Sequence, residues 1–122
     1  MRIATFISDQ FRPYLPDRCQ VNPNVLGFEL AAWLSRALAG DGVVTSYPSE
    51  EDWGWYLEFV DEDDEYLICC SGAEDDGEYE WRVFVDRPRK LFRRPPETPM
   101  EEELLESVAQ VLRSGGIAVA IE

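Results

Sequence analysis

Alternating hydrophobic and polar positions predict a run of antiparallel strands in the middle of the chain. From residue 53 to 60, and again from 79 to 86, apolar side chains occupy every second position, which is typical of a strand with one buried face. A third apolar run lies between them, after an acidic turn and before an acidic loop around Gly77. We expect strands at 53–60, 66–71 and 79–86, and we expect the first to bury Trp53, Trp55, Leu57 and Phe59 on one face.

Two segments have the spacing of amphipathic helices. In the first, apolar residues recur at helical intervals up to Gly40, and Asn22-Pro23 supplies a capping side chain and a residue suited to the first turn. The second begins with a capping box in which Thr98 is the N-cap and Glu101 stands three residues later, and it ends at a glycine pair. Further short strands are expected at 2–7 and 43–47, with an edge strand or a docked segment at 117–121.

This order of elements predicts an α+β fold: one two-layer domain, residues 1–122, with both helices packed on one face of an antiparallel meander sheet. The 122 residues include 45% hydrophobic ones, which is a globular composition large enough for a single core. Such a fold serves many unrelated functions. Function therefore has to be argued from sites.

The net charge and the absence of histidine exclude several catalytic mechanisms and several kinds of partner. Acidic residues outnumber basic ones 25 to 11, for a net charge of −14, and there is no histidine. Ser-His-Asp, Cys-His and His-metal mechanisms are therefore excluded, because each needs an imidazole. Nucleic acid and anionic membranes are not expected as partners, since both would be repelled. Three cysteines, an odd number without metal-type spacing, and an N-terminus that does not read as a signal peptide predict a cytoplasmic protein.

One group of segments resembles known sequences. The Asn22-Pro23 helix start, and the Glu-Asp-Trp-Gly-Trp start of the strand at 51–55, are similar to a set of small uncharacterised bacterial proteins of unknown function. The resemblance covers about the first half of the chain, from residue 22 to residue 59. It implies a bacterial, intracellular source and brings no activity with it.

The densest mixture of carboxylates and aromatic rings is a candidate interaction site, formed by Glu51, Asp52, Trp53 and Trp55. Trp is enriched in binding hot spots, and a neighbouring carboxylate is suited to a partner's Arg or Lys. The alternative is that the aromatic residues fill the core while the carboxylates mark a solvated strand entry. The sequence leaves both interpretations open.

A basic connector, residues 87–96, is the second candidate. Its Arg87, Arg89, Lys90, Arg93 and Arg94 either capture a phosphate or an acidic segment, or lie across the protein's own acidic loops and offset their repulsion. Within the candidate interaction set we place Arg89, Arg93 and Arg94.

Two other patterns are weighed and set aside. The carboxylates at 61–65 and 74–78 do not meet the calcium-loop template, so solvated hairpin turns with nonspecific cation binding are expected. Cys69 and Cys70 are adjacent in a predicted strand, so their side chains should point to opposite faces and behave as buried hydrophobic groups. A nucleophilic thiolate would need a neighbouring cation, for which Arg82 is the candidate.

The surplus of negative charge favours a non-enzymatic protein-interaction module, such as an immunity, antitoxin or inhibitor protein that covers a basic partner. Two alternatives stay open: a small-molecule binder or an enzyme that uses carboxylates and Arg, and a nucleic-acid mimic. We assign no catalytic, metal or cofactor-binding residue and expect no cofactor.

Overall fold

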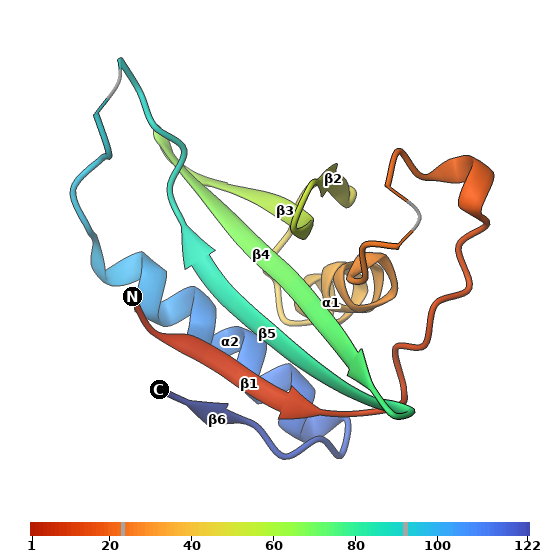
Figure 1. The fold of residues 1–122 in the computed structure, drawn as a ribbon. Coiled ribbons are helices and arrows are strands. Elements are labelled where there is room, and N and C mark those ends of the chain that lie inside the picture. Colours follow the sequence, from red (N-terminus) through yellow and green to blue (C-terminus); the bar gives the residue numbers. More distant parts are fainter. Residues whose placement is uncertain (23, 92) are drawn as a thin grey trace.

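In the described part of the chain, six antiparallel strands form one sheet and two α-helices pack against it. The computed structural model describes residues 1–22, 24–91 and 93–122, and it orders the strands β2-β3-β4-β5-β1-β6. Figure 1 shows α2 crossing behind β5 and β1. The predicted two-layer α+β fold is confirmed. The elements are β1 (Ile3–Ile7), the 3-10 turn η1 (Asp17–Cys19), α1 (Phe28–Gly40), β2 (Ser49–Glu51), β3 (Gly54–Asp61), β4 (Asp64–Asp75), β5 (Glu78–Asp86), α2 (Pro99–Ser114) and β6 (Ala120–Ile121).

The core lies between the helices and one face of the sheet, and Trp81 is at its centre. The indole of this β5 residue is fully buried, and its Nε1–H donates to the carbonyl of Ser8 at 3.0 Å. Its register partner on β4 is Gly72, where an added Cβ would lie 2.4 Å from the indole ring. Phe11 meets the indole edge-on. Trp81 therefore joins the sheet to the segment that follows β1.

The predicted loop at 72–78 is wrong, because β4 continues to Asp75 and β5 begins at Glu78. Asp76 and Gly77 form the turn between them, with φ of 54° and 84°. Two consecutive residues with positive φ match the twist of a hairpin, and Asp-Gly is a favoured pair for such turns. The Asp-Gly pair in the sequence signals this turn, and Gly72 is a strand residue whose missing side chain leaves room for Trp81.

Helix α1 begins at Phe28 with Gly27 as its N-cap, so the cap lies five residues after the predicted capping residue Asn22. The backbone N–H groups of Val21 and Asn22 donate instead to the carboxylate of Glu50 on β2, each at 2.8 Å. These bonds hold the chain against the edge strand and keep it out of a helical turn. Pro23, the predicted first-turn residue, lies outside the described residues.

The strand predicted at 43–47 is also wrong, since the edge strand forms at Ser49–Glu51. A tight turn at Asp52 and Trp53 joins β2 to β3, which starts at Gly54. Trp53 therefore precedes the strand and does not share the buried face of Trp55, Leu57 and Phe59. The short strand at the N-terminus and the C-terminal edge strand are confirmed as β1 and β6.

The capping box predicted at the start of α2 is confirmed. Glu101 Oε1 accepts the backbone N–H of Thr98 at 3.1 Å, and the Thr98 hydroxyl lies 2.6 Å from the hydroxyl of Tyr66 on β4. The cap thus ties the helix start to the sheet. Among the described helices, none has both the length and the apolar run needed to cross a membrane.

We expect Thr98→Ala to lower the free energy of unfolding by about 1 to 2 kcal/mol, because it removes the cap and leaves the Tyr66 hydroxyl without its partner. Thr98→Asp, which keeps an acceptor, should be nearly neutral. Tyr66→Phe should cost about 1 kcal/mol, and the Thr98→Ala/Tyr66→Phe double variant should cost less than the sum. Urea denaturation measures all four variants. Strict additivity would contradict a hydrogen bond between the two hydroxyls.

Candidate functional site

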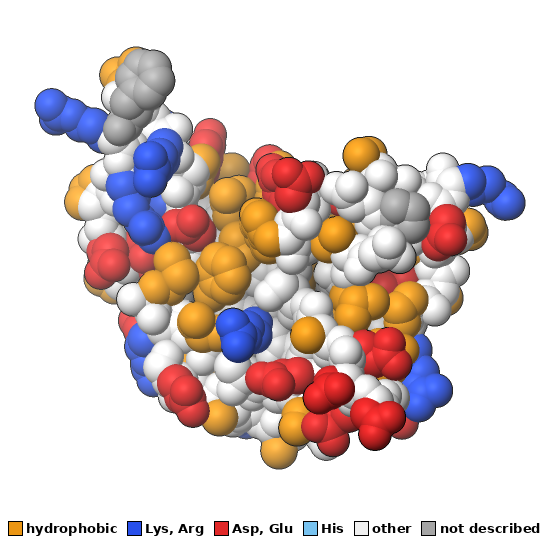
Figure 2. Space-filling model, in the orientation of Figure 1, with side chains coloured by type: hydrophobic (Ala, Val, Ile, Leu, Met, Phe, Trp, Pro, Cys, Tyr) orange, Lys and Arg blue, Asp and Glu red, His pale blue; other side chains and the backbone are white. Residues whose placement is uncertain are grey.

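The face of the sheet that points away from α1 and α2, here called the open face, carries an apolar row. Tyr56, Cys69, Phe84 and Ile3 are successive register partners across β3, β4, β5 and β1. The neighbouring row on one side is Glu58, Leu67 and Asp86. Figure 2 looks onto this face and shows hydrophobic side chains gathered over the middle of the sheet, with acidic and basic side chains around them. Arg82, two residues before Phe84 on β5, is exposed on the same face. The open face therefore has an apolar centre with charged groups of both signs beside it.

Trp53 lies on this open face. Its ring packs on that of Phe84 with the centroids 5.9 Å apart, and 45% of the residue remains exposed. Trp55, by contrast, is 6% exposed and packs edge-on against Phe28 at the start of α1. The predicted aromatic cluster is thus divided: Trp55 belongs to the core, as the second interpretation held, and Trp53 is available on the surface.

A hollow of about 390 Å³ sits beside Trp53. Its lining combines three aromatic rings, an aliphatic side chain, a thiol and two carboxylates, from Glu51, Trp53, Tyr56, Leu67, Cys69, Phe84 and Asp86. Glu51 is exposed and Asp86 is partly exposed. Aromatic walls with carboxylates at the edge suit an organic cation, which is attracted both by ring faces and by negative charge.

Cys69 forms part of the hollow, whereas Cys70 points into the core, as predicted for adjacent strand residues. Both thiols are free and buried. Burial, with smaller contributions from Asp86 and Glu51, raises the pKa of Cys69 to about 12, and burial raises the pKa of Cys70 further. Arg82, the cation considered as an activator, is exposed and pairs in register with Ser71 instead. Cys69 is therefore an inert wall of the hollow and not a nucleophile.

Asp52, the remaining acidic candidate, is partly engaged within the protein. Its Oδ1 accepts a hydrogen bond from the side-chain amide of Asn22 at 3.1 Å, in an exposed position at the β2–β3 turn. Glu50 and Glu29 are used in a similar way, because both accept backbone N–H groups of the segment between β1 and α1. Several carboxylates thus hold this segment in place, and Glu51 stays available beside the hollow.

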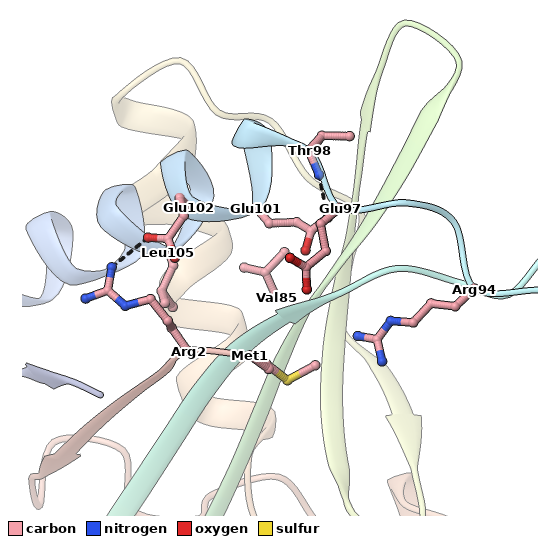
Figure 3. A pocket seen from close by; sticks show the side chains of 9 residues that line it. All are labelled: Met1, Arg2, Val85, Arg94, Glu97, Thr98, Glu101, Glu102 and Leu105. Carbon is pink, nitrogen blue, oxygen red and sulfur yellow. Dashed lines mark hydrogen bonds and ion pairs between the residues drawn. The ribbon is translucent and has the colours of Figure 1, made fainter.

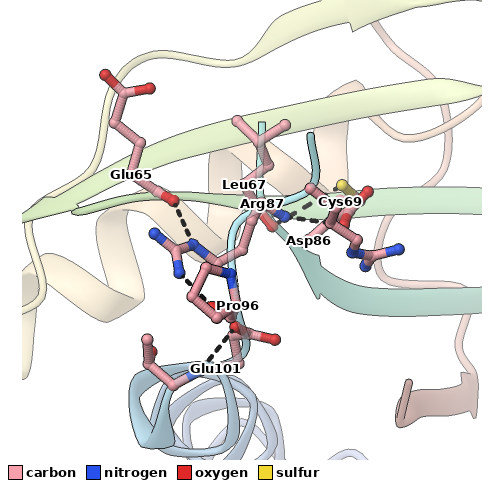
Figure 4. A network of polar contacts seen from close by, with 9 residues as sticks. Glu65, Leu67, Cys69, Asp86, Arg87, Pro96 and Glu101 are labelled. Carbon is pink, nitrogen blue, oxygen red and sulfur yellow. Dashed lines mark hydrogen bonds and ion pairs between the residues drawn. The ribbon is translucent and has the colours of Figure 1, made fainter. Parts of the chain in front are cut away.

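Two arginines of the basic connector are bound to the protein itself. Arg87 is buried and donates to the carbonyls of Glu65 and Pro96 at 3.1 and 2.7 Å (Figure 4). It also forms an ion pair with Asp64 at 3.0 Å. Its guanidinium also lies over the ring of Tyr66, 4.7 Å from the centroid.

Arg94 forms an ion pair with Asp86 at 2.6 Å. Arg87 and Arg94 thus offset the protein's own acidic groups, as the second interpretation of the connector held. Arg89 and Arg93 are exposed, with Lys90 beside them, and Arg93 exchanges backbone hydrogen bonds with Lys90. Phe92 lies outside the described residues.

A smaller hollow, of about 150 Å³, lies at the start of α2 (Figure 3). Its charged groups are largely paired with each other: Arg2 binds Glu102 at 2.7 Å, and Glu101 caps the helix. Within the part of the chain that the structure describes, no three Cys, Asp or Glu residues come together as metal ligands. The hollow on the open face is therefore the better candidate site.

The sequence pattern contained a signal for the open face. Phe84 stands at an outward position of β5, between Arg82 and Asp86, where a solvated face would carry a polar residue. On β4, Leu67 and Cys69 alternate with the buried Ile68 and Cys70, so both faces of that strand are apolar. Apolar residues at both parities indicate a strand that is covered on both faces.

At about pH 8 the folded protein should react with iodoacetamide at Cys19 alone, because Cys19 is exposed while the other two thiols are buried and protonated. In concentrated guanidinium chloride all three should react. Peptide mapping by mass spectrometry measures this, with Cys19→Ser as the control that should leave the folded protein unmodified. Native labelling of Cys69 as fast as Cys19 would show that the thiol is accessible and activated.

Comparison of the chain with protein-family models, with curated proteins and with solved structures finds no match. The site itself is therefore the basis for a functional conclusion.

Proposed function

We propose that this chain is a non-enzymatic protein-interaction module, of the kind that immunity, antitoxin and inhibitor proteins represent, and that it binds a basic partner through the open face. The observation that carries the proposal is the apolar row on that face, with an exposed Trp beside it and carboxylates around it. Exposed apolar patches rimmed by polar groups are typical of protein–protein interfaces.

Trp53 supplies the anchor of such an interface. It is a large, half-exposed ring already held by Phe84, so little conformational freedom is lost when a partner covers it. Tyr56 and Leu67 beside it are half-buried and add apolar area. The centre of the face therefore has the composition expected of a binding hot spot.

The negative charge of the chain favours a basic partner. Glu51, Glu58 and Asp86 stand on the open face together with one cation of β5, Arg82, and the chain as a whole carries a net charge of −14. A second copy of the chain would bring the same carboxylates together and be repelled, whereas a basic surface would be attracted and steered toward the site. The occupant we propose is accordingly a basic protein segment with at least one apolar side chain.

Selection of a displayed random peptide library on the protein tests this proposal. Enriched peptides should carry a net positive charge and an aromatic or aliphatic residue, and their binding should weaken as salt is raised from about 50 to 300 mM, since salt screens exposed charges. Isothermal titration calorimetry measures the affinities. Enrichment of acidic peptides, or affinities indifferent to salt, would contradict the proposal.

Trp53→Ala should weaken a selected peptide by at least about tenfold, because truncation of a hot-spot Trp costs 2 kcal/mol or more. Tyr47→Ala is the matched control, since Tyr47 is 90% exposed and lies outside the hollow. It should leave the affinity unchanged. Equal losses in the two variants would place the peptide elsewhere.

Glu51→Gln with Asp52→Asn should weaken the same peptide mainly by slowing its association, because these carboxylates steer a cation toward the face. Glu103→Gln with Glu106→Gln removes the same two charges from an exposed part of α2, on the other side of the sheet, and is the control for net charge. Surface plasmon resonance separates the two rates. If both double variants slow association equally, only net charge matters and the site is not on the open face.

A further inference from the structure

The hollow has the chemistry of a site for one particular cationic side chain. Its walls include the rings of Trp53, Tyr56 and Phe84, and two carboxylates, Glu51 and Asp86, belong to the same lining. Asp86 lies two residues after Phe84, which is the register partner of Cys69, and Glu51 ends β2 beside the turn that carries Trp53, so each carboxylate stands next to a ring of the hollow. A planar cation can stack on an aromatic ring while its edge donates to carboxylates.

Asp86 already binds such a cation in the free protein. One Nη of Arg94 lies 2.6 Å from Asp86 Oδ1, and the same oxygen accepts the backbone N–H of Arg87 at 2.8 Å. The Arg94 side chain is half exposed, so this pair is a surface ion pair and contributes little to stability. Its effect on a ligand is larger than its effect on the fold, because it neutralises one of the two carboxylates of the hollow.

We propose that the hollow binds the guanidinium group of one arginine of the basic partner, and that Arg94 occupies Asp86 until the partner arrives. This inference rests on the proposed function, of which it names the recognised group. Arginine fits better than lysine because its flat group stacks on an indole and offers several N–H donors to separate carboxylates. The pairing of Arg94 with Asp86 shows that a guanidinium can reach this carboxylate.

Arg94 then acts as an internal competitor. Its removal should free Asp86 and strengthen binding of an arginine. It also removes one positive charge from the chain, which by itself favours any cation, so a control with the same change in net charge is needed. Lys90 provides the comparison, because it is exposed on the same connector and its side chain forms no ion pair among the described residues. Lys90→Gln changes the net charge by the same amount and leaves Asp86 paired.

The experiment titrates N-acetyl-arginine amide into the protein and follows the indole N–H signal of Trp53 by NMR, assigned with Trp53→Phe. N-acetyl-lysine amide is the second probe. We expect the arginine probe to bind more tightly than the lysine probe, and Arg94→Gln to tighten its binding about twofold to fivefold, the range expected for release of a surface ion pair. Lys90→Gln should change it by less than about 1.5-fold, since Lys90 forms no ion pair with Asp86 and exposed charges are weakened by screening.

Asp86→Asn tests whether the gain is local. In that background Arg94→Gln should bring no further tightening, because the carboxylate that Arg94 neutralises is gone. A gain that persists with Asp86→Asn, or that Lys90→Gln matches, would overturn the competitor role.

The outcomes also separate this inference from the proposed function. If basic peptides bind on the open face but the Trp53 signal does not respond to the arginine probe, or responds equally to lysine, the arginine site is wrong and the interaction module stands. If neither basic peptides nor the arginine probe bind, both proposals are overturned.

Discussion

The packing of Trp81 beneath Gly72 is the contact on which the rest of the structure depends. The indole is fully buried, stacks on Tyr79, meets Phe11 edge-on and donates its N–H to Ser8. It therefore joins three parts of the fold: the central strands, the core under the helices and the segment that leaves β1. A large ring fits at this point because its register partner Gly72 has no side chain, and a Cβ there would overlap the indole in a closely packed core.

One face of the sheet packs into this core, and the other face is apolar as well. The two described helices cover the inner face, and neither of them covers the outer one, where Phe84, Leu67 and Tyr56 lie. Trp53 covers part of that surface from the β2–β3 turn, where its ring packs on Phe84, and Cys69 is buried between its register partners Tyr56 and Phe84. An apolar outer face that is only half covered is a cost in an isolated domain, and a partner would remove it.

Carboxylates perform two different structural tasks in this acidic chain. Glu29 and Glu50 accept backbone N–H groups and hold the segment between β1 and α1. Asp64 and Asp86 pair with arginines of the basic connector, and the buried Arg87 fixes that connector against β4. Because Arg87 also donates its backbone N–H to Asp86, the same anchor positions a carboxylate of the hollow. The charge left for a partner is therefore smaller, and more localised, than the net charge suggests.

The sequence by itself determined the fold class, most of the strands and the cap of α2, because alternation, helical spacing and a capping box are local patterns. It also placed Cys69 and Cys70 on opposite faces and singled out Glu51 and Trp53. The sequence placed the start of α1 too early, because Asn22 is held by the distant Glu50. It also placed Trp53 on the buried face of β3, whereas Trp53 lies in the tight turn before that strand. The hollow itself needed tertiary structure, since Glu51, Cys69 and Asp86 meet only through strand register. Alternation along one strand does not by itself say which residue of another strand will lie opposite, because register also depends on turn geometry and on the pairing of distant segments.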